Sequence, residues 1–322
     1  MATAESIAAV VEAGGAYVPE LMAALEQRLV ELASSHGRVL GEHAGATIAA
    51  GGKRLRPLLV FVSAGPDADR DAVLRAAVAV ELIHSATLVH DDVLDAAVLR
   101  RGRPTVVASA GRGIATATGD LLFSRAFAEL AGGGSAPAVR ILSDASSALV
   151  QGELLQREDA WNVATTRERY LRRCDLKTAR LFQAACQLGA LAGALDVELL
   201  GEFGRRIGLA FQLLDDVLDV SGPAERTGKH RGTDLLDGTV TLPLILARER
   251  DAEIGRLDLR AVRTPEGAEA VCDAIAATGA LVTAREEALA MVAGAKAALP
   301  ALASPQRTAL ELVADGVVDR YR

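Results

Sequence analysis

The chain has 322 residues, with 35 Lys and Arg against 42 Asp and Glu, so its formal charge is −7. Half of the residues are hydrophobic and only 3% are aromatic, and this high apolar fraction excludes a disordered chain. The acidic balance argues against a nucleic-acid-binding protein that relies on attraction to phosphates, but it leaves room for a local basic pocket that holds a small anion.

Cysteine usage and the first residues bear on the compartment. The three cysteines, at positions 174, 186 and 272, are widely spaced and form no CxxC pair. We therefore expect reduced thiols in a cytoplasmic protein, with neither a disulfide framework nor a structural zinc site. The first twenty residues carry Glu5 and Glu12 but no Lys or Arg, unlike a secretory signal. No apolar run approaches the ~18 residues of a membrane span, so we expect none.

Hydrophobic residues recur at three- and four-residue steps along most of the chain, which predicts amphipathic or buried helices. In chain order, helices are expected over residues 17–32, 71–94, 114–131, 138–156, 171–191, 199–220 and 266–298. Glycine and proline clusters separate them, and no short alternating runs indicate a sheet. The sequence therefore predicts an all-α fold of ten or so helices in a single domain over residues 1–322.

One acidic motif occurs twice in identical letters, DDVLD, at residues 91–95 and 215–219. At about 1.5 Å rise per residue, the first and last Asp of each motif stand one turn apart on one helical face. Carboxylates beside apolar residues need a cation, and incompletely wrapped oxygen ligands suit Mg²⁺ that is shared with substrate phosphates. An acidic helix end in solvent explains one copy but not two. The predicted metal ligands are Asp91, Asp92, Asp95, Asp215, Asp216 and Asp219.

Cations accompany the two acidic motifs. The stretch GGKRLRP at residues 51–57 supplies Lys53, Arg54 and Arg56 beside a flexible glycine pair, just ahead of an apolar helix. Further donors are Arg100, Arg101, Lys177, Thr178 and Lys229. Together these groups indicate Mg²⁺ ions that bridge one diphosphate and a second diphosphate that is held by cations alone.

Three polar residues lie close to the acidic motifs on the same helices. His84 lies seven residues before Asp91, two turns back on its face, and is expected to contact a ligand. His90 is expected to point elsewhere and to be structural. Gln212 lies three residues before Asp215, where its amide can donate to a metal-bound phosphate or steady a positive charge.

On these motifs, the sequence resembles the trans-isoprenyl diphosphate synthases (polyprenyl synthetase family), of the medium- or long-chain type. The resemblance runs in the family's order through GGKRLRP at 51–57, HSATLVHDDVLD at 84–95, RRGRPT at 100–105, KT at 177–178, FQLLDDVLD at 211–219 and GK at 228–229. It implies a single all-α bundle around a deep central cavity, and a homodimer.

The resemblance also implies substrates and residue roles. Asp91, Asp95 and Asp215 would hold Mg²⁺ on the diphosphate of an allylic substrate, which would also be contacted by Arg100, Lys177, Thr178, Gln212 and Lys229. Isopentenyl diphosphate would be held by Lys53, Arg56, His84 and Arg101. Metal and lysine charge, with Lys177 and Lys229 as the catalytic lysines, would stabilise the departing diphosphate. The double bond of isopentenyl diphosphate would then attack the allylic cation in trans (E) geometry, and the released diphosphate is the expected proton acceptor.

The sequence departs from the family at one position. The family often has a second Lys after the second acidic motif, in a GKxT stretch, and Thr239 stands there in this chain. Because Lys177 and Lys229 remain, we expect allylic diphosphate binding to be modestly weaker but not lost.

Product length is expected to depend on the helix that carries the first acidic motif. Ala86 and Thr87, five and four residues before Asp91, lie one turn below the metals. Short-chain members of the family typically have a bulky aromatic residue there, so two small residues predict an open floor and a polyprenyl product longer than geranylgeranyl. Phe123, on a neighbouring helix, is either a deeper plug or an ordinary core residue.

Other functions account for less of the sequence. The runner-up is a short-chain (farnesyl or geranylgeranyl) diphosphate synthase. A class I terpene cyclase needs no second diphosphate site and leaves GGKRLRP unexplained. A non-catalytic subunit of a heteromeric synthase usually lacks the acidic motifs, and a purely structural helical protein leaves them without a purpose.

Overall fold

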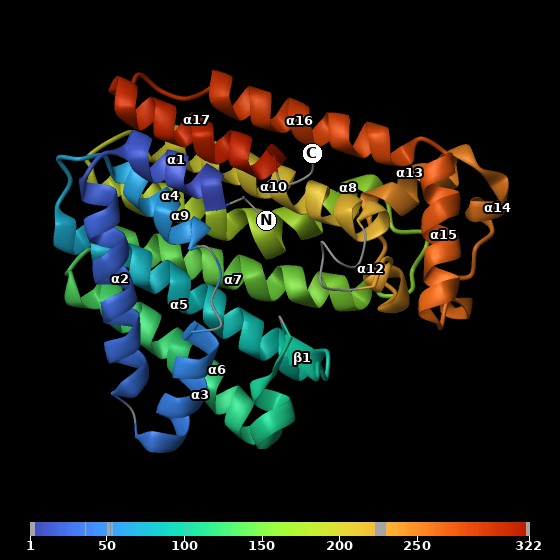
Figure 1. Ribbon diagram of the computed structural model, residues 1–322, viewed down its shortest axis with the longest axis horizontal. Helices are drawn as coiled ribbons and strands as arrows, with labels where there is room; N and C mark the ends of the chain where they lie inside the picture. The colour runs from blue at the N-terminus through green and yellow to red at the C-terminus, as the bar shows by residue number, and fades with distance from the viewer. Residues whose placement is uncertain are drawn as a thin grey trace.

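Helices make up nearly all of the regular structure, as the sequence predicts (Figure 1). The computed structural model describes residues 4–35, 37–49, 52, 54–100, 102–222 and 230–319. The helices are α1 (Ala4–Gly14), α2 (Tyr17–Ser34), α3 (Arg38–Ala49), α4 (Leu55–Ala64), α5 (Arg70–Leu94), α6 (Val106–Gly132), α7 (Ala136–Glu158), α8 (Arg167–Cys174), η1 (Asp175–Ala179), α9 (Arg180–Ala192), α10 (Val197–Ser221), α12 (Thr233–Leu236), α13 (Leu242–Arg250), α14 (Ala252–Gly255), η2 (Leu259–Ala261), α15 (Pro265–Ala277), α16 (Ala280–Ala297) and α17 (Ser304–Asp319). A short antiparallel pair, β1 (Leu99–Arg100) and β2 (Arg103–Pro104), lies between α5 and α6.

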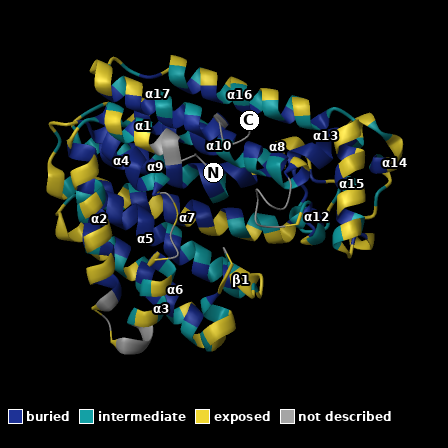
Figure 2. Ribbon diagram, in the orientation of Figure 1, coloured by how far each residue is buried: buried dark blue, intermediate teal, exposed yellow. Residues whose placement is uncertain are grey.

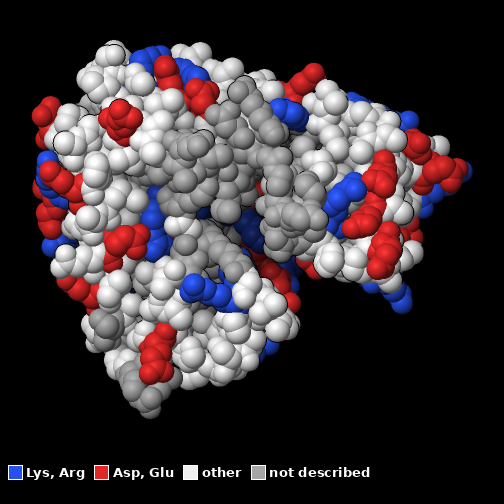
Figure 3. Space-filling model, in the orientation of Figure 1, with Lys and Arg blue, Asp and Glu red and all other residues white. Residues whose placement is uncertain are grey.

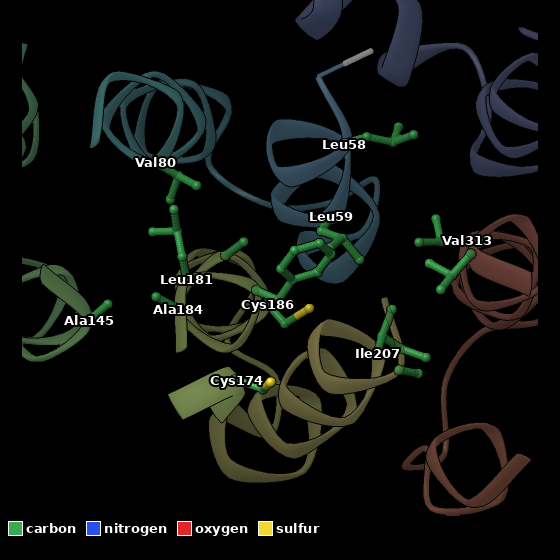
Figure 4. Packing of buried hydrophobic residues seen from close by; sticks show 14 of the residues in the cluster. Leu58, Leu59, Val80, Ala145, Cys174, Leu181, Ala184, Cys186, Ile207 and Val313 are labelled. Carbon is green, nitrogen blue, oxygen red and sulfur yellow. The ribbon is translucent and has the colours of Figure 1, made fainter. Parts of the chain in front are cut away.

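The core lies along α4, α5, α9 and α10, which carry long runs of buried residues (Figure 2). Figure 4 shows side chains of these helices that belong to one buried hydrophobic cluster, among them Leu59 of α4 and Cys186 of α9. At Gly189 of α9 an added Cβ would lie 2.3 Å from the carbonyl oxygen of Val60, so the backbones of α9 and α4 pack closely there. Because α9 packs against both α5 and α10, it holds the two helices that carry the acidic motifs in a fixed relation.

The helix ends explain where the first acidic motif lies. Asp69 caps the start of α5 by accepting hydrogen bonds from the backbone N–H groups of Asp71 and Ala72. The helix then runs without a break through Leu94, and Asp95 is its C-terminal cap. Asp91 and Asp92 therefore lie in the last turn of α5, and the expected helix over residues 71–94 is confirmed.

Two of the expected helices are broken. Residues 171–191 were expected to form one helix, but a π-helical turn, η1, separates α8 from α9 and carries Lys177 and Thr178. Such single π turns are frequent at functional sites. Residues 266–298 form α15 and α16, which are separated at Gly279, whose φ of 74° lies in the left-handed region. The hydrophobic period continues through both breaks, so periodicity alone did not reveal them.

The helix expected over residues 114–131 is longer in the structure, where α6 extends from Val106 to Gly132. It begins at Val106, where the Thr105 side chain accepts a hydrogen bond from the N–H of Ala108, and Gly111 (φ 80°) interrupts its helical geometry. The single-domain organisation over residues 1–322 stays a prediction.

The expectation that no apolar segment is long enough to span a membrane is wrong for α5. By length and composition alone it is apolar enough to cross a membrane, and the bent pairs α1–α2 and α15–α16 pass the same test if each pair is counted as one span. In α5, however, 67% of the apolar window is buried by the rest of the described chain. Packing inside the bundle accounts for the composition of this helix.

Candidate active site

Two cavities flank the C-terminal half of α5, and different faces of this one helix line them. The first, of about 300 Å³, is the hairpin cavity, lined by His84, Leu88 and Asp92 of α5, His43 and Thr47 of α3, and the β1–β2 hairpin. The second, of about 350 Å³, is the α7 cavity, lined by Thr87, His90 and Asp91 of α5 together with residues of α6, α7 and η1. Figure 3 shows a hollow in the middle of the molecule in which basic and acidic side chains lie close together.

The polar end of the α7 cavity combines Asp91 with groups from α7 and η1. Lys177 of η1 donates hydrogen bonds to Glu153 and, at 3.1 Å, to Gln156 of α7. Burial raises the pKa of Asp91 to about 6, although the positive charge of Lys177 opposes this shift. Burial would also raise the pKa of Glu153, but Lys177 and then Arg157 outweigh it and lower that pKa. The cavity therefore holds a carboxyl group that binds its proton more tightly than an exposed aspartate does, because its burial is only partly offset by positive charge.

Asp95 and Asp92 are each held by an arginine. Nη2 of Arg157 donates to Oδ1 of Asp95 at 2.7 Å, and its Nε donates to Oε1 of Glu153 at 2.9 Å. Nε and Nη2 of Arg100 lie 2.9 Å and 2.8 Å from Oδ1 of Asp92. Two of the three aspartates of the first acidic motif are thus paired with cations from β1 and α7, of which sequence analysis singled out Arg100 as a site residue but not Arg157.

The second acidic motif has a buried member that is bonded on both oxygens. The Tyr170 hydroxyl donates to Oδ2 of Asp216 at 2.6 Å, and the amide nitrogen of Gln212 donates to Oδ1 at 2.8 Å. The Thr178 hydroxyl donates in turn to the amide oxygen of Gln212 at 2.7 Å. Burial, with the nearby charge of Asp234, raises the pKa of Asp216 to about 8 despite these bonds. Thr178 and Gln212, both predicted to be site residues, are therefore directly connected.

The π turn η1 links the two acidic motifs. Lys177 lies against α7 and beside Asp91, whereas the next residue, Thr178, bonds to Gln212 of α10. η1 packs closely on α7, because a Cβ added at Gly152 would lie 2.5 Å from the backbone nitrogen of Lys177. One turn thereby reaches both acid-bearing helices.

The arginines of GGKRLRP have different environments. Arg54, in the left-handed region (φ 51°), is buried and paired with Glu26 and Glu81, and it also donates to the carbonyl of Ile48. Its role is to join α2, α3 and α5. The Arg56 guanidinium lies over the ring of Phe182, 4.7 Å from its centroid.

Some expected site residues cannot be compared with the structure. Lys53, Arg101 and Lys229 lie outside the described residues. Of the described residues of the isopentenyl site, His84 lines the hairpin cavity with Arg100, whereas Arg56 lines neither cavity. The same cavity adds His43, Thr47 and Arg103, which the sequence analysis did not single out.

The residues expected to control product length separate in the structure. Thr87 and Phe123 both line the α7 cavity, whereas Ala86 is fully buried and lines neither cavity. His90, expected to point elsewhere, lines the α7 cavity as well, and its ring stacks on Phe123 with centroids 5.8 Å apart. Gly119 of α6 makes room for this ring, since a Cβ there would lie 2.2 Å from His90 Nε2. In the sequence, the feature that could have indicated this position of His90 is the small residue Gly119 in the facing helix.

The donor set fits a weakly wrapped, hard cation. Among the described residues no three His, Cys, Asp or Glu side chains converge on one point. A metal here would therefore bind to few carboxylates at a time and complete its shell with water and substrate oxygens, as Mg²⁺ typically does. The chemistry of the carboxylates suits that ion, and their arginine partners would have to yield to it.

The site combines acidic motifs on two helices with a cavity on either face of α5. The polyprenyl synthetase family model matches residues 38–277, and the chain belongs to that family. Component 2 of the heptaprenyl diphosphate synthase of Geobacillus stearothermophilus is 43% identical over 235 residues, 72% of this chain and 73% of that protein. The octaprenyl diphosphate synthase of Escherichia coli K12 is 35% identical over 310 residues, 94% of this chain and 96% of that protein.

A solved structure agrees with these relatives. The polyprenyl synthase from Caulobacter crescentus CB15, complexed with calcium and isoprenyl diphosphate, has a TM-score of 0.88 and 36% identity, over 98% of both chains. The chain is thus an all-α trans-prenyl diphosphate synthase, a transferase of isoprenoid biosynthesis. Its relatives favour elongation to a polyprenyl diphosphate over the short-chain alternative.

Proposed function

We propose that this chain uses Mg²⁺ to add isopentenyl diphosphate repeatedly to an allylic diphosphate, and that its product is longer than geranylgeranyl diphosphate. The observation that carries the proposal is the position of the turn η1 between the two acidic motifs. Its consecutive residues Lys177 and Thr178 each make a hydrogen bond to a residue that lies beside one of the motifs. The calcium and isoprenyl diphosphate in the Caulobacter crescentus structure support a divalent cation and a diphosphate at this kind of site.

Asp91, Asp95 and Asp215 are the proposed metal ligands. Asp92 and Asp216 are buried and already bonded to Arg100 and to Tyr170 and Gln212, so they brace the two motifs. When bound, Mg²⁺ supplies positive charge that stabilises the departing diphosphate. Lys177 adds charge from η1, and the apolar walls of the α7 cavity keep water away from the allylic cation.

Isopentenyl diphosphate binds in the hairpin cavity in this proposal. His84 and Arg100 line this cavity, together with Arg103. The last turn of α5 separates it from the α7 cavity, so the two reactants approach the end of this helix from different faces. Arg groups suit the diphosphate because their forked donors match phosphate oxygens.

The growing chain enters the apolar part of the α7 cavity, where Thr87 is small and Phe123 with His90 forms an aromatic plate. The position of Thr87 supports an open path beside α5.

Thr239 in place of the family Lys weakens allylic binding modestly in this proposal, and a Thr239→Lys variant whose allylic affinity dropped would contradict it.

We also propose a homodimeric assembly in the cytoplasm. The name of the Geobacillus stearothermophilus relative, component 2, makes a two-component assembly the alternative. Light scattering of the purified chain at activity-assay concentrations distinguishes the homodimer from the two-component assembly. An active dimer supports the first, whereas a monomer that is inactive alone supports the second.

Product analysis tests the proposed reaction. The purified chain is incubated with isopentenyl diphosphate and each allylic starter, with and without Mg²⁺, and the product mass is measured. We expect products longer than geranylgeranyl diphosphate only when Mg²⁺ is present. Farnesyl or geranylgeranyl products would support the short-chain alternative, and a cyclised hydrocarbon would support a terpene cyclase. Asp91→Asn and Asp215→Asn should lose at least about 100-fold in turnover, whereas Asp144→Asn, an exposed change on α7, should not.

A further inference from the structure

Arg157 of α7 holds Asp95, although sequence analysis did not single Arg157 out as a site residue. Its Nη2 donates to Asp95, its Nε donates to Glu153, and its Nη1 lies 3.4 Å from the carbonyl oxygen of Leu94. All three contacts come from one guanidinium at the C-terminal end of α5. Glu153 also accepts from Lys177, so an unbroken chain of charges runs from Asp95 through Arg157 and Glu153 to Lys177.

The Asp95–Arg157 end of this chain of charges is accessible, which distinguishes it from a buried structural pair. The Arg157 side chain is 40% exposed and that of Asp95 is 52% exposed. Exposed pairs are worth little and exchange partners at small cost. A ligand with more negative charge than a single carboxylate can therefore draw the guanidinium away.

A guanidinium hydrogen-bonded to Oδ1 of Asp95 occupies a lone pair that a metal ion could use, and its charge weakens the attraction of the carboxylate for a second cation. Guanidinium and Mg²⁺ also repel each other at contact distances, so Arg157 on Asp95 opposes metal binding in the absence of substrate. A diphosphate offers Arg157 and Lys177 several anionic oxygens at once, and Arg forks bind such oxygens strongly. When the two cations move to a diphosphate, Asp95 is released.

We propose that Arg157 is a positioning residue that exchanges between Asp95 and the diphosphate, so that metal and diphosphate bind cooperatively. The inference rests on the proposed function, because it takes the anion to be the allylic diphosphate. Linkage requires the effect to be reciprocal, because the factor by which bound diphosphate raises the affinity for metal equals the factor by which bound metal raises the affinity for diphosphate.

The chain provides a closely matched control in Arg206. Its Nε donates to Glu202, four residues earlier, at 2.8 Å, as Arg157 does to Glu153 at 2.9 Å. Its Nη1 lies 3.2 Å from the carbonyl oxygen of Gly294, and its side chain is 39% exposed. Arg206 differs from Arg157 chiefly in having no acidic-motif Asp as a partner.

The experiment measures two ligands separately by titration calorimetry on the full chain. Mg²⁺ alone is titrated into the protein without substrate, and inorganic diphosphate alone is titrated in metal-free buffer. In Arg157→Met we expect Mg²⁺ to bind about two- to fivefold more tightly and diphosphate to bind about two- to fivefold more weakly. Arg206→Met should change neither value, and Arg157→Lys, which keeps the charge, should lie closer to the wild type.

If Arg157 had only a structural role, its replacement would change the affinities for Mg²⁺ and for diphosphate in the same direction, or would change neither of them. Unchanged or weaker Mg²⁺ binding in Arg157→Met would overturn the proposal, as would unchanged or tighter diphosphate binding. Arg157→Gln carries the same expectations if the Met variant does not fold. Because neither titration needs turnover, a wild type that makes no prenyl product would defeat the proposed function without deciding this inference.

Discussion

Arg54 shows how a single basic residue of a binding motif can belong to the core. Its side chain is 7% exposed and that of its partner Glu81 is 4% exposed. Burial is the largest influence on Glu81 and raises its pKa, and Arg54 offsets part of that shift. The pair therefore stabilises the fold only as long as both partners are present.

Arg54→Met should lower the free energy of unfolding by about 3–5 kcal/mol, because it leaves the Glu81 carboxylate buried without a partner. Urea denaturation measures the change. Arg70→Met, which breaks an exposed pair with Glu20, is the control and should cost at most about 1 kcal/mol. A double variant, Arg54→Met with Glu81→Leu, should recover part of the loss, and a double variant less stable than Arg54→Met would count against this explanation.

Thr87 and Ala86 are neighbours with different expected effects on the product. Thr87→Phe should shorten the product with little loss of stability, because the new ring enters the α7 cavity. Ala86→Phe should instead destabilise the fold by about 1–3 kcal/mol, because Ala86 is fully buried in the packed core. Product mass and thermal unfolding are measured for both. An Ala86→Phe enzyme that is fully stable and makes a shorter product would show that Ala86 faces the growing chain.

At the scale of elements, η1 depends on its close packing against α7. Gly152→Ala would put a Cβ 2.5 Å from the backbone nitrogen of Lys177, so η1 must move. We expect the allylic kcat/KM to fall at least tenfold, together with a loss of about 1–3 kcal/mol in stability. Gly113→Ala in α6 is the control, because nothing lies within 4 Å of its added Cβ. Equal activity in the two variants would argue against a role for η1 in catalysis.

The break between α15 and α16 depends on one glycine. Gly279→Ala should destabilise the chain by about 1 kcal/mol, because φ is 74° there while space for the Cβ is available, with Arg250 Nη1 nearest at 3.6 Å. Gly267→Ala, within helical α15, should be neutral or slightly stabilising. Urea denaturation of the two variants tests this difference, and a neutral Gly279→Ala would mean that the break has another cause.

Local patterns predicted the elements better than the contacts between them. The helical period is local in sequence, so the helix that carries each acidic motif was predicted nearly to its ends. The π turn η1 keeps almost the same apolar period as a helix, so it was missed. The partner of Asp95 lies 62 residues away, and no local rule connects them.

The direction of a side chain was also only partly predictable. Helical spacing relates His90 to Asp91 on the same helix but says nothing about the helix opposite, where Gly119 leaves room for the ring. The Glu153–Arg157 spacing on α7 was the only sequence signal that an ion pair lies beside the site.

At the scale of the whole molecule, we expect the fold not to depend on a metal. A buried hydrophobic cluster extends from Val10 to Val318, and Asp92 and Asp95 are neutralised by arginines. Removing Mg²⁺ with a chelator should therefore abolish turnover yet change the melting temperature by no more than about 2 °C, unlike proteins whose structural metal supplies folding energy. Thermal unfolding with and without chelator checks this, and restored activity after Mg²⁺ is added back is the control. Cooperative unfolding on chelation alone would contradict it.

The placement of the two cavities against a single helix has an evolutionary consequence. Leu88 and Thr87 are adjacent in the chain, yet one faces the hairpin cavity and the other the α7 cavity. Under the proposed assignment of the five-carbon donor to the hairpin cavity and of the growing tail to the α7 cavity, mutations one codon apart should retune the two recognition steps independently. A lineage could then change its product length while its monomer unit stays the same.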